Sequence, residues 1–574
     1  MDAKKVYQLW CSDTYFDEKT KEELKAMKQD DKEIEERFYK DLEFGTGGLR
    51  GIIGAGTNRM NIYTVRKATQ GLSNFIRKER AEKKGVAIAF DSRNMSPEFA
   101  EEAALCLAAN GIKAYIFPSL RPTPMLSFAL RELGCTAGIV VTASHNPPEY
   151  NGYKVYWEDG AQITAPKDKQ IIAEVNAITD YAQVKTMDRE AAEAAGLYQV
   201  IGPEIDDKYM EALKSLAIHP EIIKEEAGNL KIVYTPLHGT GNIPVRRILE
   251  ELGFSQVYVV KEQELPDGNF PTVSYPNPED KNAFALALKL AKEVDADIVL
   301  ATDPDADRLG VYAKDSATGE YRSFTGNMSG MLILEYLLSQ RKEMGTLPEN
   351  GAVVTTIVSG KMSKEMTKAY NVSLIETLTG FKYIGEQIKF FEQNHEHEYI
   401  FGYEESYGCL VGTHARDKDA VVAVMALCEV AAYCKHNGIT LCDQMQNIFE
   451  KYGFYKEGLC TVTLKGQDGA KKIEQMMEKI RNDVPETVGD LKVTQFRDYK
   501  ENILLDCISG TKTTTGLPNS NVLYFELEDG AWCCIRPSGT EPKIKFYIGV
   551  KGNSEEDGAE KLKKLTAAVE KLAE

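Results

Sequence analysis

The sequence has little that would anchor it in a membrane or hold it in an oxidising compartment. No apolar run reaches the about 18 residues that a membrane-spanning helix needs, and the first ten residues, MDAKKVYQLW, lack the apolar segment of a signal peptide. The 11 cysteines are odd in number and include no C-x-x-C pair, which argues against both a disulfide framework and a zinc site. We therefore expect a cytoplasmic protein.

The sequence also lacks an excess of basic residues. It has 69 Lys and Arg against 87 Asp and Glu, a net charge of −18 at pH 7. This charge repels nucleic acid and anionic membranes, so we expect neither as a partner. A small phosphate ester is repelled as well, so a site for one needs cations concentrated locally. We expect a monomer or a weak dimer that acts on a small molecule.

The chain is long enough for about four domains at 574 residues, and its composition is that of an ordinary globular protein. Three segments open alike, each with an apolar strand, a small-residue loop and a helical stretch: 85–91, 230–236 and 351–357. Each is followed by a second strand and a polar loop, at 139–145, 297–307 and 399–406. This repetition indicates three α/β domains.

The end of the chain has a different pattern. A final helix carries Leu562, Leu565, Val569 and Leu572 on one face, after several strand-like segments. We predict a smaller α+β domain there and place the four domains at 1–205, 206–325, 326–455 and 456–574. Residues 1–40 carry mixed acidic and basic side chains, which favour a solvated outer helix.

The motif TASHNP, residues 142–147, follows the β-branched run 139–141, which predicts a buried strand. Two prolines and an Asn-Gly turn then stiffen the chain. Ser144 is therefore expected at the tip of a rigid loop, with His145 beside it and Lys154 on the next strand. A hydroxyl with basic neighbours suits a nucleophile or a phosphate carrier. The alternative is a serine that only satisfies turn hydrogen bonds.

The motif DPDADR, residues 303–308, follows another buried strand. Alternate carboxylates in an extended loop project to one side, so Asp303, Asp305 and Asp307 form an oxygen-rich site suited to Mg²⁺. The motif is not an EF-hand, because Arg308 stands at the sixth position where glycine is required. The alternative is a polar surface turn.

The charge at this site must be balanced locally. Three aspartates and a phosphoserine bring about −5 against +2 from one metal ion. Arg308, Lys154 and Arg50, with His145 nearby, are the cations that we expect to offset the remainder. Arg50 lies in the glycine-rich segment 44–51, where backbone N–H groups can approach an anion, although a plain flexible turn is equally compatible with this segment.

Three further loops carry side chains suited to a sugar phosphate. Glu404 and Ser406 in GYEES can bond vicinal hydroxyls, or can simply satisfy a turn. Lys382 in TGFK can transfer protons if its pKa is lowered, or can be a solvated surface lysine. We assign substrate binding to Arg308, Thr379, Gly380, Glu404 and Ser406. The stretch RPSGTEPK forms a phosphate-binding nest from backbone N–H groups, hydroxyls and cations: Arg536, Ser538, Gly539, Thr540 and Lys543.

Two histidines are interpreted as structural. His238 is expected to bond within its loop, and His414 is expected at a helix entry, where Arg416 and Lys418 add positive charge.

Taken together, TASHNP, DPDADR, GYEES and RPSGTEP in this order resemble the α-D-phosphohexomutase family, from about residue 40 to the end of the chain. TGFK and GYEESYG resemble its phosphoglucomutase branch, with bacterial α-phosphoglucomutases and phosphopentomutase-like relatives. The resemblance implies three related α/β domains with mixed sheets and a C-terminal TBP-like α+β domain around a central cleft. It implies a phosphoserine at Ser144 that ligates Mg²⁺ together with the three aspartates.

Two positions depart from the pattern of this family. Gly47 stands where many members have serine, so a hydroxyl contact is missing there. GYEESYG replaces the commoner GEESGH, which leaves hexose and pentose substrates both open.

The resemblance implies interconversion of glucose 1-phosphate and glucose 6-phosphate through glucose 1,6-bisphosphate. Phosphopentomutase and phosphomannomutase activities are the nearest alternatives, and a weak mutase that makes the bisphosphate is another. A serine-dependent sugar-phosphate phosphatase would instead release inorganic phosphate. A non-catalytic sugar-phosphate sensor would show no turnover.

Overall fold

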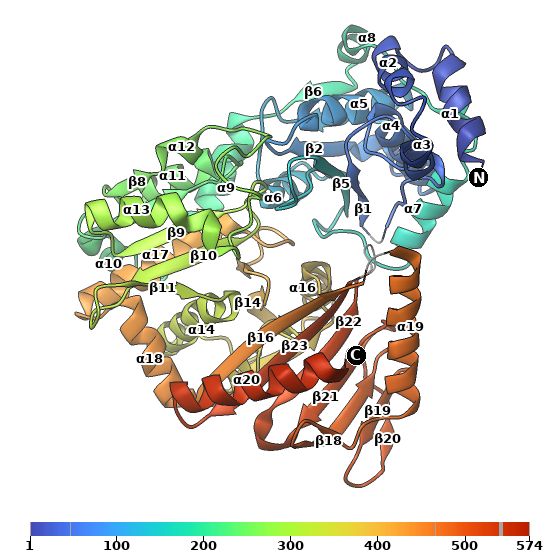
Figure 1. Cartoon of the computed structure of the whole chain (residues 1–574). Helices are drawn as coiled ribbons and strands as arrows, with labels where there is room; N and C mark the ends of the chain where they lie inside the picture. Colours follow the sequence, from blue (N-terminus) through green and yellow to red (C-terminus); the bar gives the residue numbers. More distant parts are fainter. Residues whose placement is uncertain (1, 46, 465, 539–542, 573–574) are drawn as a thin grey trace. The chain divides into compact units, whose positions relative to one another are not determined.

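The computed structural model describes residues 2–45, 47–464, 466–538 and 543–572. Figure 1 shows the helices and strands. The chain divides into two compact units, each treated by itself. The first comprises Met1–Ser329 and Phe381–Leu441, and the second comprises Gly330–Gly380 and Cys442–Glu574. Helices α14 (Gly326–Glu343) and α18 (Leu441–Tyr452) begin in the first unit and continue in the second.

The first sheet is six-stranded and mixed. Its order is β1 (Gly48–Ile52), β5 (Tyr150–Trp157), β4 (Ala137–Val141), β2 (Val86–Phe90), β3 (Ala114–Ile116) and β6 (Tyr198–Val200). β2 and β4 are parallel, whereas β5 runs antiparallel to β4 and to β1. β2 and β4 are buried along their whole length, as expected for strands covered on both faces. Their carboxyl ends meet at one edge of the sheet, where ligands bind in such folds.

Helices cover this sheet, and α5 and α6 pack directly against β2 and β4. The elements of this region are α4 (Ile62–Lys78), η1 (Glu82–Lys84), α5 (Ser96–Ala109), α6 (Thr123–Glu132), α7 (Lys167–Asn176), η2 (Tyr181–Gln183), α8 (Arg189–Ala194), α9 (Pro203–Lys214) and α10 (Pro220–Glu226).

The N-terminal residues form three helices rather than one exposed helix: α1 (Ala3–Ser12), α2 (Glu18–Ala26) and α3 (Asp31–Phe38). Trp10 is fully buried, its ring stacks on Phe16, and it meets Phe38 and Tyr63 edge-on. The expected solvated face is present, but the prediction misses this aromatic core. Phe38 ends α3 and Tyr63 lies on α4, so this core forms only when these helices pack against α1.

The second sheet is five-stranded and mixed. Its order is β11 (Tyr321–Phe324), β10 (Leu309–Lys314), β9 (Ile298–Thr302), β7 (Ile232–Thr235) and β8 (Val257–Val259). The parallel strands β7 and β9 have every residue buried. The accompanying helices are α11 (Asn242–Glu251), α12 (Lys261–Glu264), η3 (Lys281–Phe284) and α13 (Ala285–Val294).

The first unit also contains a later part of the chain. Its elements are α16 (Phe381–Asn394), β14 (Glu398–Glu404), β15 (Gly408–Val411) and α17 (Ala420–His436). β14 and β15 form a hairpin, and the side chain of Asp419 caps α17 by accepting from the N–H groups of Val421 and Val422.

The second unit holds a parallel strand pair and a large antiparallel sheet. The pair is β12 (Gly351–Thr356) and β13 (Ser373–Thr377), connected by α15 (Met362–Tyr370). The sheet runs in the order β16 (Phe454–Thr463), β23 (Lys543–Gly552), β22 (Trp532–Pro537), β21 (Leu523–Leu527), β18 (Leu491–Asp498), β19 (Ile503–Asp506) and β20 (Lys512–Thr513), with β17 (Thr487–Val488) beside β18. Its other elements are α19 (Gly466–Asn482), η4 (Glu528–Gly530) and α20 (Glu555–Leu572).

The predicted amphipathic helix at the end of the chain is confirmed as α20, drawn in red in Figure 1. Leu565 and Val569 are buried, and Leu562 and Leu572 pack at the edge of the same core. The helix lies on β23 and β16. The predicted fold class, mixed-sheet α/β domains followed by an α+β domain, is thereby confirmed, while the four domain boundaries stay predictions.

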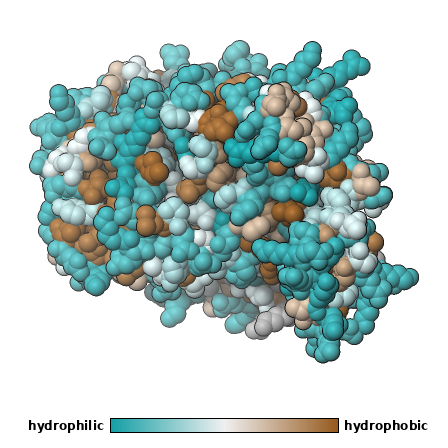
Figure 2. Space-filling model, turned by 90° about the horizontal axis from the view of Figure 1, so that it is seen from above, coloured by the Kyte–Doolittle hydropathy of each residue, from teal (hydrophilic) through white to brown (hydrophobic). Residues whose placement is uncertain are grey.

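The surface agrees with the composition. Figure 2 shows a face dominated by hydrophilic residues, with hydrophobic residues scattered among them. Among the described residues, no helix combines the length and the apolar content needed to cross a bilayer.

Candidate functional site

Ser144 lies three residues beyond the carboxyl end of β4 and is buried. Its hydroxyl donates a hydrogen bond to Asp303 Oδ2 at 2.8 Å, and its Oγ is 3.2 Å from Nδ1 of His145. The backbone φ of Ser144 is +51°, in the left-handed region. A non-glycine residue there costs roughly 1–3 kcal/mol, which the surrounding structure must supply. In this conformation the hydroxyl contacts Asp303, the residue after β9 of the second sheet.

The aspartate loop begins where β9 ends at Thr302. Oδ1 of Asp303 accepts from the backbone N–H groups of Asp307 (3.1 Å) and Arg308 (3.0 Å), and Ala306 has a left-handed φ of +49°. The loop therefore folds back on itself. It brings one carboxylate oxygen from each of Asp303, Asp305 and Asp307 within 4.8 Å of one another.

The three carboxylates are buried and need a cation. Burial and the neighbouring carboxylates of Asp305 and Asp307 raise the pKa of Asp303 well above its usual value. Oδ1 of Asp305 and Oδ1 of Asp307 are buried and accept no hydrogen bond from the described residues. Carboxylate oxygens that lie this close together are the ligands that hard divalent cations prefer. A divalent metal ion therefore fits the donor atoms present.

Two lysines flank the aspartates. Nζ of Lys154 is 2.9 Å from Asp305 Oδ2, and Nζ of Lys418 is 3.2 Å from Asp307 Oδ2. Burial lowers the pKa of each lysine, but the adjacent carboxylates outweigh it and raise both above the usual value. Both lysines are therefore ammonium ions at neutral pH. Arg308 forms an ion pair with Glu279, and its Nε is 3.8 Å from Asp307 Oδ1.

The GYEES segment lies next to the aspartates and Lys418. Glu404 ends β14 and is buried, and the hydroxyl of Ser406 donates to its Oε1 at 2.8 Å. Nζ of Lys418 is 3.9 Å from this same oxygen. The carbonyl of Tyr407 accepts from the N–H of Leu309 at 2.9 Å, which ties the segment to the strand after the aspartate loop.

Arg50 and Lys382 are nearer to solvent. Arg50 is exposed on β1, and its Nη1 is 3.4 Å from Oδ1 of Asn146 in the serine loop. Lys382 is half-buried in the first turn of α16, with Nζ 5.1 Å from the ring centroid of Tyr383. Glycine at position 47 leaves room for the side chain of Gln162. A Cβ there would lie 2.3 Å from Nε2 of Gln162, so a serine requires that side chain to move.

The remaining predicted residues belong to the second unit. Thr379 and Gly380 follow β13, Arg536 lies on β22, and Lys543 begins β23. The N–H of Ser538 donates to the carbonyl of Lys543 at 2.8 Å, which closes the hairpin loop. Gly539 and Thr540 lie outside the described residues. A role for this loop in binding phosphate stays a prediction.

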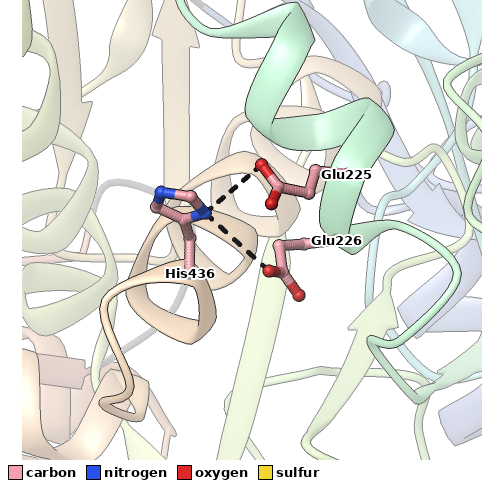
Figure 3. A group of neighbouring side chains, drawn as sticks. All are labelled: Glu225, Glu226 and His436. Carbon is pink, nitrogen blue, oxygen red and sulfur yellow. Dashed lines mark ion pairs between the residues drawn. The ribbon is translucent and has the colours of Figure 1, made fainter.

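A second group of possible metal ligands lies away from the aspartates, on α10 and the last turn of α17 (Figure 3). Nδ1 of His436 is 3.5 Å from Glu225 and 3.8 Å from Glu226. Glu225 and His436 are exposed, so these contacts are surface ion pairs that contribute little to stability.

Three family models match consecutive parts of the chain. They describe α/β/α domains I, II and III of phosphoglucomutase/phosphomannomutase and match residues 41–182, 207–318 and 325–452. The chain belongs to the phosphoglucomutase/phosphomannomutase family. The resemblance to α-D-phosphohexomutases is thereby confirmed.

Relatives from staphylococci extend this membership over almost the whole chain. A protein of Staphylococcus epidermidis named phosphoglucomutase is 37% identical over 522 residues, 91% of this chain and 93% of its own. One of Staphylococcus aureus with the same name is 36% identical over 535 residues, 93% and 94% of the two chains.

Solved structures of the family share the fold. A putative phosphomannomutase from Thermus thermophilus has a TM-score of 0.68 at 22% identity and covers 93% of this chain and 99% of its own. Parafusin, a phosphoglucomutase from Paramecium, also has a TM-score of 0.68, at 18% identity, with 93% and 96% covered.

Two residues of the site are not among those that the sequence pointed to. The sequence predicts Lys418 only as positive charge near His414, whereas its side chain lies between Asp307 and Glu404. Thr123 carried no signal, yet its hydroxyl donates to Asp305 Oδ2 and its N–H donates to the Asp305 carbonyl, both at 2.9 Å. His414 itself is structural, as expected. Its Nε2 is 2.7 Å from Asp419, which caps α17.

Substitution of Asp305 by Asn tests the metal site of this family member. We expect Asp305→Asn to weaken divalent-cation affinity by about 10–100-fold, because one of three anionic ligands is lost. Calorimetric titration of the apoprotein with Mn²⁺ measures this affinity. Asp297→Asn, at the other end of β9 and paired with Lys435, is the control and should bind as wild type does. Equal affinity of all three proteins would contradict the assignment.

Proposed function

We propose that this protein is a phosphoglucomutase, an isomerase that interconverts α-D-glucose 1-phosphate and glucose 6-phosphate. Membership of the family and the phosphoglucomutase relatives support the enzyme class. The observation that carries the chemistry is the 2.8 Å hydrogen bond from the Ser144 hydroxyl to the buried aspartate triplet. A hydroxyl beside a cation site is where a phosphoryl group can be both attached and neutralised.

The proposed reaction has two transfers. Phosphorylated Ser144 gives its phosphoryl group to the free hydroxyl of glucose 1-phosphate, which forms glucose 1,6-bisphosphate. The bisphosphate reorients, and Ser144 takes the other phosphoryl group. In each transfer one P–O bond breaks, one forms, and a proton moves between the sugar and serine oxygens. The position of Nδ1 of His145, 3.2 Å from Ser144 Oγ, supports its assignment to the serine proton. Lys154 and Lys382 are the other candidates for proton transfer.

We assign the cation to Mg²⁺, held by Asp303, Asp305, Asp307 and the phosphorylated Ser144. When bound, it supplies positive charge to the transferring phosphoryl group. Lys154, Lys418 and Arg308 offset the remaining negative charge. Lys418 also reaches toward Glu404, so it places positive charge between the aspartates and the residues assigned to the sugar, Glu404 and Ser406.

Binding of the phosphate that does not react is assigned to the last domain, through Arg536, Ser538, Gly539, Thr540 and Lys543. Thr379 and Gly380 are assigned to substrate binding, and Arg50 is assigned to the catalytic residues as a local cation. We place the protein in the cytoplasm as a monomer or weak dimer that binds neither nucleic acid nor membrane. Its eleven free cysteines agree with a reducing compartment.

Replacing Ser144 tests the phosphoryl carrier. With glucose 1,6-bisphosphate present, Ser144→Ala should lower mutase kcat by about 10³-fold or more, because the accepting oxygen is gone. Ser73→Ala, a buried serine on α4 that bonds only to the Thr69 carbonyl among the described residues, should retain activity. Full activity of Ser144→Ala would falsify the scheme.

The same assay separates the other functions. A mutase releases almost no inorganic phosphate, whereas a phosphatase releases it in step with substrate loss, and a sensor does neither. Faster turnover of ribose 1-phosphate or mannose 1-phosphate than of glucose 1-phosphate would reassign the substrate.

Replacing Lys418 tests its electrostatic role. Lys418→Met should lower kcat by about 10²–10³-fold, because a preorganised positive charge beside the transferring group is lost. Lys418→Arg should recover part of the activity. Lys435→Met is the control, since Lys435 forms its ion pair with Asp297 on the far end of β9. The role would be refuted if Lys418→Met stayed within threefold of this control.

A further inference from the structure

Arg93 lies between β2 and α5, and its side chain has no exposed surface. Its Nη1 donates to the carbonyl oxygens of Pro147 at 2.8 Å and Tyr150 at 3.1 Å. Its Nη2 donates to the carbonyl oxygens of Ser144 at 2.5 Å and of Asn146. One guanidinium group therefore binds three carbonyls of the loop that carries Ser144, including that of Ser144 itself, and the carbonyl of Tyr150, the first residue of β5.

The loop needs such a partner. It connects β4 to β5 outside the ladder of the sheet, and its two prolines have no N–H to donate. Buried carbonyl groups without donors are costly. The planar fork of an arginine can serve four acceptors at once from two terminal nitrogens, whereas a lysine has only three N–H donors, all on one nitrogen.

Arg93 is itself held on the side of the first sheet. Its Nε is 3.4 Å from Asp91 Oδ2 in a fully buried ion pair. Oδ1 of Asp91 accepts from the Arg93 N–H at 2.9 Å and from the Ser96 hydroxyl at 2.7 Å. These contacts within the first-sheet region fix the position of the guanidinium group independently of the serine loop.

Phe270, from the second-sheet region, covers the other side. Its ring centroid is 5.0 Å from Cζ of Arg93, and the ring is buried. Phe270 lies in the segment 265–272, and His238 holds both ends of that segment. The two ring nitrogens of His238 lie 3.0 Å from the Leu265 carbonyl and 2.9 Å from the Thr272 hydroxyl. His238 thus has a structural role, as expected, but its partners lie in another segment rather than in its own loop. The segment that carries Phe270 therefore links Arg93 to the region that also carries the aspartate loop.

We propose that Arg93 is a positioning residue for phosphoryl transfer, which sets the direction of the Ser144 hydroxyl by binding these four carbonyls while Phe270 holds the guanidinium in place. The inference rests on the proposed function, because it takes Ser144 as the phosphoryl carrier. Among the described residues, the Arg93 side chain donates its hydrogen bonds to backbone carbonyls. Its loss should therefore misplace Ser144 Oγ relative to Asp303 and slow the chemical step more than substrate binding.

The test compares Arg93→Lys with a matched control, Arg66→Lys. Arg66 also has a carboxylate partner, Glu102 at 2.6 Å, and an aromatic neighbour, Tyr63, but it lies on α4. Arg93→Lys should lower kcat by roughly 10–100-fold with the KM for glucose 1-phosphate within threefold, since small misplacements of reacting groups cost this much. A kcat within threefold of Arg66→Lys, or a loss that matches the fraction unfolded, would overturn the proposal.

Chemical rescue gives a second readout that a purely structural role would not move. Arg93→Ala leaves a space the size of a guanidinium group, so millimolar guanidinium should raise its kcat several-fold and leave Arg66→Ala unchanged. If Arg93→Ala does not fold, the kcat comparison of Arg93→Lys with Arg66→Lys alone decides whether the proposal holds. Folded Arg93→Ala without rescue counts against the proposal.

Amide hydrogen exchange separates this inference from the proposed function. Exchange in the peptide 138–154 should be roughly tenfold faster in Arg93→Lys than in wild type and Arg66→Lys, because the loop opens more often. If wild type has no mutase activity, the proposed function fails, and the exchange result still decides whether Arg93 holds the loop. Unchanged exchange in that peptide would refute it.

Discussion

The buried carboxylates of Asp303, Asp305 and Asp307 are the constraint on which the site depends. Three negative charges cannot share a dry space without positive charge between or around them. The loop brings them together with two backbone hydrogen bonds to Asp303 and a left-handed residue at Ala306. Lys154 and Lys418 neutralise part of the negative charge. One oxygen of Asp305 and one of Asp307 accept no hydrogen bond from the described residues, so they can bind a metal ion. We propose that such a cation site serves the phosphoryl group carried by Ser144, whose hydroxyl is 2.8 Å from Asp303.

Strands from separate parts of the chain position the serine, the aspartates and the glutamate of the site. β4 ends before Ser144, β9 ends before Asp303, and β14 ends at Glu404. Each of these strands is buried almost throughout, so each loop is anchored to a strand in the core. Contacts between loops then fix their relative positions within the first unit. Thr123 binds Asp305, and Tyr407 binds Leu309. Positioning thus comes from strands, and chemistry comes from loops.

Much of this arrangement is readable from the sequence because the decisive motifs are contiguous. TASHNP and DPDADR each follow an apolar run that predicts a buried strand, and their residue types alone indicate a carrier hydroxyl and a metal site. The amphipathic spacing of Leu565 and Val569 likewise predicts α20. Lys418, Thr123 and Arg93 are different. Each has a decisive partner more than fifty residues away in sequence, so only the packed structure shows that contact. The aromatic core around Trp10 likewise depends on packing between separate elements.

The central claim is that the Ser144 oxygen carries a phosphoryl group during turnover. The most direct measurement is the intact mass of the purified protein, with peptide mapping, before and after incubation with glucose 1,6-bisphosphate and Mg²⁺. We predict the added mass of one phosphoryl group, mapped to Ser144 and removed by excess glucose 1-phosphate. A protein that turns over substrate while Ser144 never carries phosphate would contradict it.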